Sequence, residues 1–182
     1  MIGAIAGDMI GAPYERIPTK SKDIITVVAE FTDDTVLTVA VADWILNGTD
    51  CAATIKRYAR KYHNLPYGGS FRGWFNSSDS KPYDSFGNGS AMRVSPVGFA
   101  YNSVAEVLNF AKRSAEVTHN HPEGIKGAQA TALAIFMSRM GKPKEDIRCE
   151  ITARFDYNLH RTVDEIRPGY DFDVSCQGSV PE

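Results

Sequence analysis

The sequence predicts an all-α fold, a compact multi-helix domain that spans residues 1–182. Two observations carry this prediction. Apolar residues recur at helical spacing in several segments, and many of these segments begin or end at proline or glycine. Strand signals are scarce, because only residues 24–30 read as a short β-branched run. With 43% hydrophobic content, a chain of this length can bury a proper core.

Three segments of the N-terminal third have helical signals. Residues 3–11 are rich in small side chains and are followed by Pro13, which a helix cannot easily pass. Residues 35–46 carry apolar side chains around much of the circumference, which predicts a central buried helix. Residues 51–63 are amphipathic, with a basic face assigned to solvent. That face consists of Lys56, Arg57, Arg60 and Lys61.

The middle of the chain is predicted to form long ordered loops. Residues 65–95 are rich in glycine, serine, asparagine and proline, and they enclose a short helix at residues 71–75. Loops of this length inside a compact domain are usually functional. Their aromatic side chains are interpreted as core or lid, with stacking on an adenine or ribose as the alternative. These are Tyr67, Phe71, Trp74 and Phe75.

Helical patterns resume in the C-terminal half at residues 103–118, 122–140 and 144–156. The longest of them has Pro122 at its first position and Gly141 as its stop signal. Its small residues should let a neighbouring helix approach closely. They are Gly127, Ala128, Ala130, Ala132 and Ala134.

Composition narrows the range of functions. Twenty basic and 22 acidic residues give a net charge of −2, which argues against a nucleic-acid binder. Three widely spaced cysteines argue against a disulfide framework and against a cysteine zinc site. The apolar N-terminus lacks a basic region and contains Asp8, so it does not read as a signal peptide. No segment is long enough to span a bilayer, so we expect a soluble protein, and the cysteine pattern fits a reducing cytoplasm best.

Thr32, Asp33 and Asp34 directly precede the predicted central helix. One interpretation is a helix N-cap, where hydroxyl and carboxylate groups satisfy free amides. One carboxylate suffices for a cap, however, and two adjacent ones repel each other unless a cation lies between them. Oxygen ligands favour a hard ion such as Mg²⁺ or Mn²⁺. Asp8 and Glu15 flank the turn near Pro13 and have the simpler interpretation of exposed acids or caps.

Two further motifs have a structural and a ligand-binding interpretation. Gly87, Asn88, Gly89 and Ser90 form either a tight turn into a helix or a small phosphate cradle of backbone amides. His119 and His121 suggest zinc, but no third or fourth nitrogen or sulfur ligand stands at a helpful spacing. A histidine just before a helix is better interpreted as a hydrogen-bonding group beside an anion site.

Taken together and in this order, the motifs resemble the ADP-ribosylglycohydrolase family. The resemblance covers the small-residue helix through Glu15, the acidic motif at residues 31–35, the loop at residues 87–94, and the histidine region at residues 117–128. Residues 175–182 also look similar to the family. Each motif is weak alone, and four in register make the match specific.

The resemblance implies an all-helical hydrolase that holds two Mg²⁺ or Mn²⁺ ions and cleaves the glycosidic bond of ADP-ribosylated proteins or small ADP-ribosyl substrates. It implies Thr32, Asp33 and Asp34 as metal ligands, with both aspartates and Glu15 as catalytic residues. Glu15 would be the acid or base. The residues it implies for substrate binding are Gly87, Asn88, Gly89, Ser90 and His119.

The sequence departs from the family at one motif. The second metal motif, of the form Gly-Asp-Ser/Thr-Asp-Ser/Thr, is absent, and Asp171 and Asp173 lack its glycine and hydroxyl neighbours. We therefore expect a C-terminally truncated version of the fold, an incomplete second metal site, slow or absent hydrolysis, and apolar surface that promotes homo-oligomers. The alternatives are a non-catalytic binder of ADP-ribose or a nucleotide, and a structural relative of the crystallin type.

Overall fold

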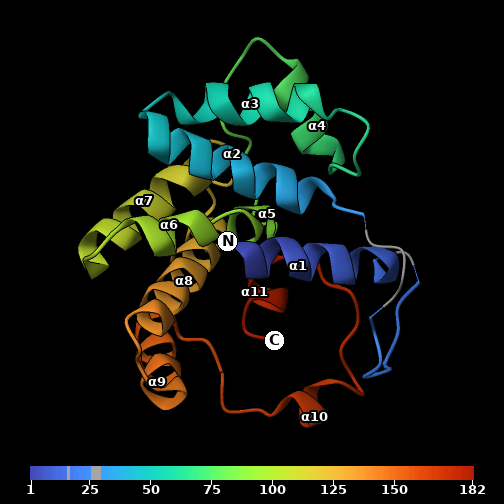
Figure 1. The fold of residues 1–182 in the computed structure, drawn as a ribbon, viewed down its shortest axis with the longest axis vertical. Helices are drawn as coiled ribbons and strands as arrows, with labels where there is room; N and C mark the ends of the chain where they lie inside the picture. The colour runs from blue at the N-terminus through green and yellow to red at the C-terminus, as the bar shows by residue number, and fades with distance from the viewer. Residues whose placement is uncertain (16, 26–29) are drawn as a thin grey trace.

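The computed structural model describes residues 1–15, 17–25 and 30–182, and its regular structure is helical (Figure 1). The described elements are α1 (Ile2–Gly11), the 3₁₀ turn η1 (Ala12–Tyr14), α2 (Asp33–Asn47), α3 (Cys51–Lys61), α4 (Gly69–Asn76), α5 (Gly89–Met92), α6 (Ser95–Ala100), α7 (Val104–Glu116), α8 (Pro122–Arg139), α9 (Lys144–Phe155), α10 (Val163–Ile166) and α11 (Cys176–Ser179).

The prediction of an all-α fold is therefore confirmed. Within the described ranges the one β-type pairing is an isolated antiparallel bridge between Gly87 and Ser175. The β-branched run predicted at residues 24–30 lies mostly outside the described residues, since 26–29 are not among them. Across the described parts of the chain, no helix combines the length and the apolar character that crossing a membrane would require.

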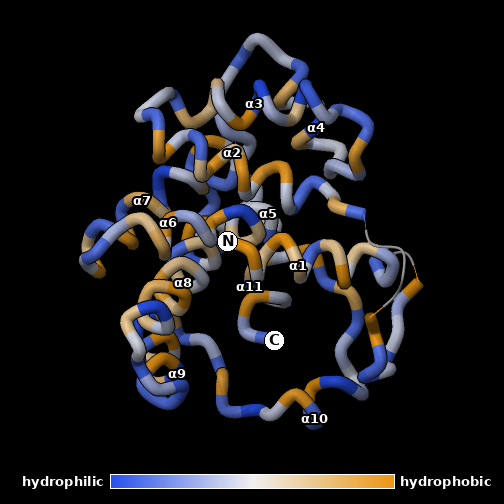
Figure 2. The backbone as a smooth tube through the Cα atoms, in the orientation of Figure 1, coloured by the Kyte–Doolittle hydropathy of each residue, from blue (hydrophilic) through white to orange (hydrophobic). Residues whose placement is uncertain are grey.

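Helix α2 is the central element, as the sequence predicts. Thr32 caps its first turn by accepting the backbone N–H of Asp34, and Gly48 ends it with a φ of 62°. Ala40 and Val41 are completely buried, and α2 packs against α1, α3 and α6. Figure 2 shows hydrophobic positions recurring along α2 and along the helices that it contacts. The Asp33–Asp34 pair is thereby fixed at the start of a rigid helix.

The basic face predicted for α3 is only partly solvated, and the assignment of Lys56 was wrong. Lys56 is 5% exposed, and its ammonium group donates to the backbone carbonyls of Ser77 and Asp79. Its Nζ also lies 4.6 Å from the ring centroid of Trp74. The alkyl stem of a lysine can cross apolar surface to reach such acceptors, and periodicity alone does not reveal them.

The small residues of α8 permit close helix contacts, as expected. A Cβ atom at Gly127 would lie 2.4 Å from Cys176 Sγ of α11, so glycine is required there. Ala128 and Ala132 are completely buried, and α8 packs against α5, α6, α7, α9 and α11. The aromatic residues of the middle region join the same connected core. They are Tyr67, Phe71, Trp74 and Phe75.

The C-terminal segment is anchored in the helical core by a buried residue, whereas the N-terminal helix α1 is mostly not buried. After α9 the chain runs along the lower edge of Figure 1 through α10, then returns to α8 as α11. Cys176 anchors this return, because it is completely buried. Helix α1, in contrast, buries only Asp8, and its Ile2 is 85% exposed. Apolar side chains are thus accessible along α1.

Candidate active-site cleft

One cavity of about 840 Å³ connects several distant parts of the chain. Its walls include the acidic residues at the start of α2, the segment at residues 66–71 that leads into α4, the loop before α5, and the segment around α11. A volume of this size falls within the range typical of small-molecule sites. The predicted residues that line it are Glu15, Asp33, Asp34, Gly87, Asn88, Gly89 and His119.

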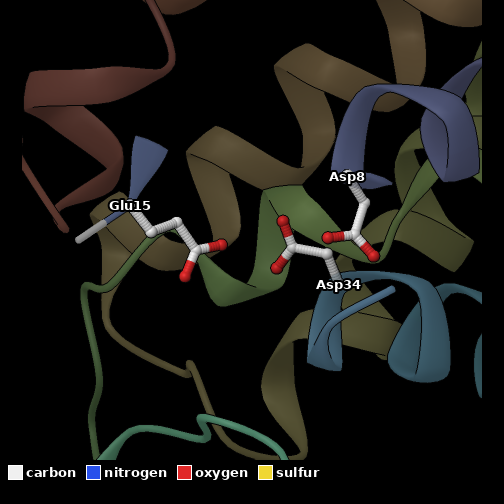
Figure 3. Close-up of side chains that lie close together, drawn as sticks. All are labelled: Asp8, Glu15 and Asp34. Carbon is white, nitrogen blue, oxygen red and sulfur yellow. The ribbon is translucent and has the colours of Figure 1, made fainter. Parts of the chain in front are cut away.

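Three carboxylates lie close together (Figure 3), and two of them, Glu15 and Asp34, line the cavity. Asp8 of α1, Glu15 after η1 and Asp34 of α2 each offer a carboxylate oxygen, and these oxygens lie within 4.8 Å of one another. Of the described histidine, cysteine and acidic side chains, these are the ones that gather closely enough to hold a metal ion. An all-oxygen donor set of this kind fits a hard divalent cation.

Asp8 is largely engaged in holding helix α2 in place. Its Oδ2 accepts the backbone N–H groups of Thr32 (2.8 Å) and Thr35 (3.1 Å) and the Thr35 hydroxyl (2.5 Å). Its Oδ1 accepts the Thr32 hydroxyl at 2.6 Å. Because these donors belong to the first turn of α2, a buried carboxylate of α1 satisfies the free amides of its neighbour. Asp8 therefore fixes the position of the residues that face the cavity.

Thr32, Asp33 and Asp34 have distinct environments within this arrangement. The Thr32 hydroxyl donates to Asp8 and accepts from the Asp34 N–H, which leaves one of its lone pairs unused by these bonds. Burial, and secondarily the charges of Asp33, Asp8 and Glu15, raises the pKa of Asp34 to about 7. Burial also raises the pKa of Asp33, while its own backbone N–H opposes the shift. The carboxylates thus repel one another and favour a positive ion.

The raised pKa of Asp34 leads to a pH-dependent prediction. Near pH 7 this carboxyl is partly protonated, and a cation must displace that proton. We therefore expect Mn²⁺ to bind about tenfold more tightly at pH 8 than at pH 6. Isothermal titration at both pH values would measure this change. An equally steep dependence in Asp34→Asn would assign the proton to another group.

The raised pKa of Asp34 also determines how the stability of the folded chain changes with pH. The folded pKa lies above the ordinary value of 3.8, so the folded state holds the proton more firmly than the unfolded state. In metal-free protein, the resulting contribution to stability is complete below pH 3.8 and is lost as the pH rises through about 7. A bound cation would offset that loss at neutral pH, because it binds the ionised carboxylates of the folded state.

The opposite wall of the cavity contains the predicted glycine-rich loop. Here the amide of Asn88 donates to Val174 O at 2.7 Å, and its side chain donates to Ser179 Oγ at 3.0 Å. The Gly87 amide donates to the Ser85 hydroxyl. These two amides are therefore occupied within the chain, which weakens the interpretation of the loop as a phosphate cradle of backbone amides.

Ser90 differs from the rest of the predicted substrate-binding set. It is completely buried, its hydroxyl donates to Gly124 O at 2.7 Å, and its Oγ lies 3.6 Å from Cys176 Sγ. Its side chain supports the packing between α5, α8 and α11 and is absent from the cavity wall. Gly89, in contrast, lines the wall next to the ring of His119.

The two histidines before α8 have separate roles. His119 is 5% exposed and lines the cavity, whereas His121 caps α8 by accepting the backbone N–H of Glu123 on its Nδ1. Burial, reinforced by the charge of Arg93, lowers the pKa of His119 to about 3. A neutral imidazole in this wall is consistent with a hydrogen-bonding role.

Sequence reasoning left Asp8 among the ordinary acids, yet it belongs to the acidic end of the site. A signal was present, because Asp8 is the one charged residue in an otherwise apolar, small-residue helix, and a lone charge there requires a partner. The contributions of Tyr83, Phe172 and Val174 to the cavity had no local signal. Those three residues reach the cleft only through the tertiary path of their loops.

The described chain is thus an all-helical domain in which acidic side chains and a histidine line one cavity. Residues 1–172 match the sequence profile of the ADP-ribosylglycohydrolase family, so this chain belongs to that family.

Individual relatives agree with this placement. The chain is 30% identical to the mouse protein named ADP-ribosylhydrolase ARH3, over 78% of this chain and 48% of the mouse protein. It is 28% identical to the cattle protein of the same name, over 80% of this chain and 50% of that protein. An uncharacterised protein from Archaeoglobus fulgidus is 27% identical over 92% of this chain and 63% of its own length. The chain therefore spans about half the length of the animal relatives it matches.

Proposed function

We propose that this chain is a single ADP-ribosylglycohydrolase-like domain. It would bind ADP-ribosyl groups in the described cavity and hydrolyse their glycosidic bond with a divalent cation. The observation that carries the proposal is that one cavity joins the acidic cluster to the wall formed by Gly87, Gly89 and His119. ADP-ribose is a long, polar ligand, and such a cavity offers it an ionic end and a hydrogen-bonding wall. Family membership and the resemblance to ADP-ribosylhydrolases support the same assignment.

Asp34 is our first candidate for a carboxylate ligand of Mg²⁺ or Mn²⁺, because it lines the cavity and belongs to the cluster of three carboxylates. Asp33, which lines the cavity but lies outside that cluster, and the remaining lone pair of Thr32 are further candidate donors. Asp8 is a weaker candidate, because its Oδ2 already accepts three hydrogen bonds. A bound cation would supply charge stabilisation at the ribose oxygens as the bond breaks. A second ion would be held weakly, because Asp173 accepts the Ser175 N–H at 2.7 Å and does not line the cavity.

Glu15 is our candidate for the acid or base. Its carboxylate is directed toward Asp34 in Figure 3, and it lines the cavity. In the proposed reaction water adds its hydroxyl to the anomeric carbon, and the leaving nitrogen or oxygen takes the proton. Glu15 would position that water or transfer the proton. We expect slow turnover, since the second metal motif is absent from the sequence.

The test combines binding and turnover on the unmodified chain. We expect ADP-ribose to bind with micromolar or weaker affinity, and free ADP-ribose to be released slowly from arginine-linked, serine-linked or small-molecule conjugates. Mg²⁺ or Mn²⁺ should support the release, and a chelator should stop it. Binding without release would favour the non-catalytic alternative. Absence of both would contradict the proposal and leave the structural, crystallin-type role.

The exposed apolar residues of α1 support one further proposal about assembly. Ile2 is largely exposed on a helix that buries only Asp8, and exposed apolar surface promotes association. Homo-oligomers in solution, detected by light scattering, are therefore an expected property of this chain.

A further inference from the structure

Arg93 is a buried cation that the proposed reaction does not use. It is completely buried between α5 and α6, and in the described part of the chain it forms no ion pair with a carboxylate. Its Nη2 donates to the backbone carbonyl of Ser114 at 2.7 Å and to the hydroxyl of Thr118 at 2.8 Å. Burying a guanidinium without a carboxylate is costly, so its placement requires an explanation.

The hydroxyl of Thr118 connects the Arg93 guanidinium to the imidazole of His119. Thr118 is completely buried, and its Oγ1 lies 2.7 Å from Nδ1 of His119. A guanidinium can only donate, so Thr118 Oγ1 must accept from Arg93. Among the hydrogen bonds described for Thr118 Oγ1, the one acceptor for its own proton is His119 Nδ1. The imidazole then accepts at Nδ1 and carries its proton at Nε2.

The protonated nitrogen, Nε2, lies beside Gly87 and Gly89, which also line the cavity. A Cβ atom built on Gly89 would lie 3.1 Å from His119 Nε2, and one built on Gly87 would lie 3.6 Å from it. No described side chain or backbone group forms a hydrogen bond with this Nε2, and the residue lines the cavity. The two glycines therefore leave space around a donor that is free to meet a ligand.

We propose that Arg93 and Thr118 are positioning residues that hold His119 as its neutral Nε2–H tautomer, so that the cavity presents a fixed, uncharged donor beside Gly87 and Gly89. The acceptor would be an oxygen of the bound nucleotide sugar, a ribose hydroxyl or a phosphate oxygen. The identity of that ligand rests on the proposed function. The tautomer itself rests only on the hydrogen-bond chain within the protein.

If the hydrogen bonds of Arg93 and Thr118 had only a structural role, the expected result would be different. If Arg93 and Thr118 only connected α5 with the end of α7, removing the threonine hydroxyl would lower stability without changing the protonated nitrogen of His119. In our proposal, removal of the hydroxyl frees Nδ1, and the ring can take up either tautomer. The protonation state of the two ring nitrogens therefore separates the two interpretations.

The first experiment measures the tautomer in the unmodified chain without any ligand. ¹⁵N-detected correlation spectra of the histidine rings, with His119 assigned by comparison with His119→Gln, report which nitrogen carries the proton. We expect a proton on Nε2, none on Nδ1, and no titration of this ring between pH 5 and pH 8. A proton on Nδ1, or an imidazolium in that range, would overturn the proposal.

The second experiment compares Thr118→Val with Thr118→Ser. Valine matches the shape of threonine and removes the hydroxyl, whereas serine keeps the hydroxyl and serves as the matched control. We expect valine to give a mixed tautomer and about three- to tenfold weaker ADP-ribose binding, the effect of one uncharged hydrogen bond. Serine should retain both properties. An unchanged tautomer in the folded valine variant would overturn the proposal.

The two experiments also separate this inference from the proposed function. If the unmodified chain does not bind ADP-ribose, the proposed function fails, and the ring spectra still decide the role of Thr118. If ADP-ribose binds but His119 has its proton on Nδ1, the function stands and this inference fails. Should Thr118→Val not fold, the spectra of the unmodified chain and of Thr118→Ser still give the answer.

Discussion

Asp34→Asn should lower metal-supported hydrolysis by at least about 100-fold and weaken Mn²⁺ binding to a similar extent. Asparagine has nearly the same shape as aspartate but lacks the charge that attracts a cation. Burial, and secondarily the charges of Asp33, Asp8 and Glu15, raises the pKa of the Asp34 carboxyl to about 7. The same substitution removes the repulsion between Asp34 and these charges. The metal-free variant should therefore be at least as stable as the unmodified chain at pH 8.

This combination of lost function and retained stability is the diagnostic result. The matched control is Asp43→Asn, which removes a carboxylate from the same helix at its other end, where Asp43 pairs with Arg57. That variant should retain Mn²⁺ binding and turnover. Its melting temperature should change little, because Arg57 is 63% exposed and asparagine keeps an oxygen that can accept a hydrogen bond. Native Mn²⁺ affinity in Asp34→Asn would show that the cation is held elsewhere. Circular dichroism of both variants would show whether they are folded, so that a loss of Mn²⁺ binding can be distinguished from unfolding.

Local signals in the sequence were sufficient for the longer helices but not for the short helices α6 and α10, and they revealed only part of the cleft. The start of α2 was predictable because Thr32, Asp33 and Asp34 are both capping residues and oxygen ligands, and the structure shows the cap. The stop of α8 at Gly141 was equally local, since its φ of 74° suits glycine. Such features depend on a few neighbouring residues, which a single sequence displays directly.

Contacts with distant segments are not visible in the sequence. The amphipathic pattern predicts a solvated Lys56, yet this residue reaches backbone carbonyls of a loop more than 20 residues away. The hydroxyl of Ser90 is bonded to Gly124, which no local motif indicates. The amide of Asn88 is bonded to Val174, which belongs to a segment 86 residues later. Periodicity and motif spacing contain no information about such acceptors, because tertiary packing supplies them.

Asp8 shows how one of these distant contacts organises the site. Its two oxygens accept four hydrogen bonds from Thr32 and Thr35, and all four donors are at the first turn of α2. The carboxylate joins α1 to α2, and it belongs to the one residue that α1 buries. The Asp8 carboxylate therefore helps to set the position of Asp33 and Asp34 relative to α1.

We expect Asp8→Ala to destabilise the chain by about 3–5 kcal/mol, because it leaves buried donors without an acceptor and removes the charge that faces the start of α2. Urea unfolding monitored by circular dichroism would measure the loss. The matched control is Asp50→Ala at the N-cap of α3, where the carboxylate accepts a single exposed N–H at 2.7 Å. That change should cost only about 1 kcal/mol. Equal losses in both variants would mean that Asp8 acts as an ordinary cap. In that case the link between α1 and the acidic end of the cleft would have to come from other contacts.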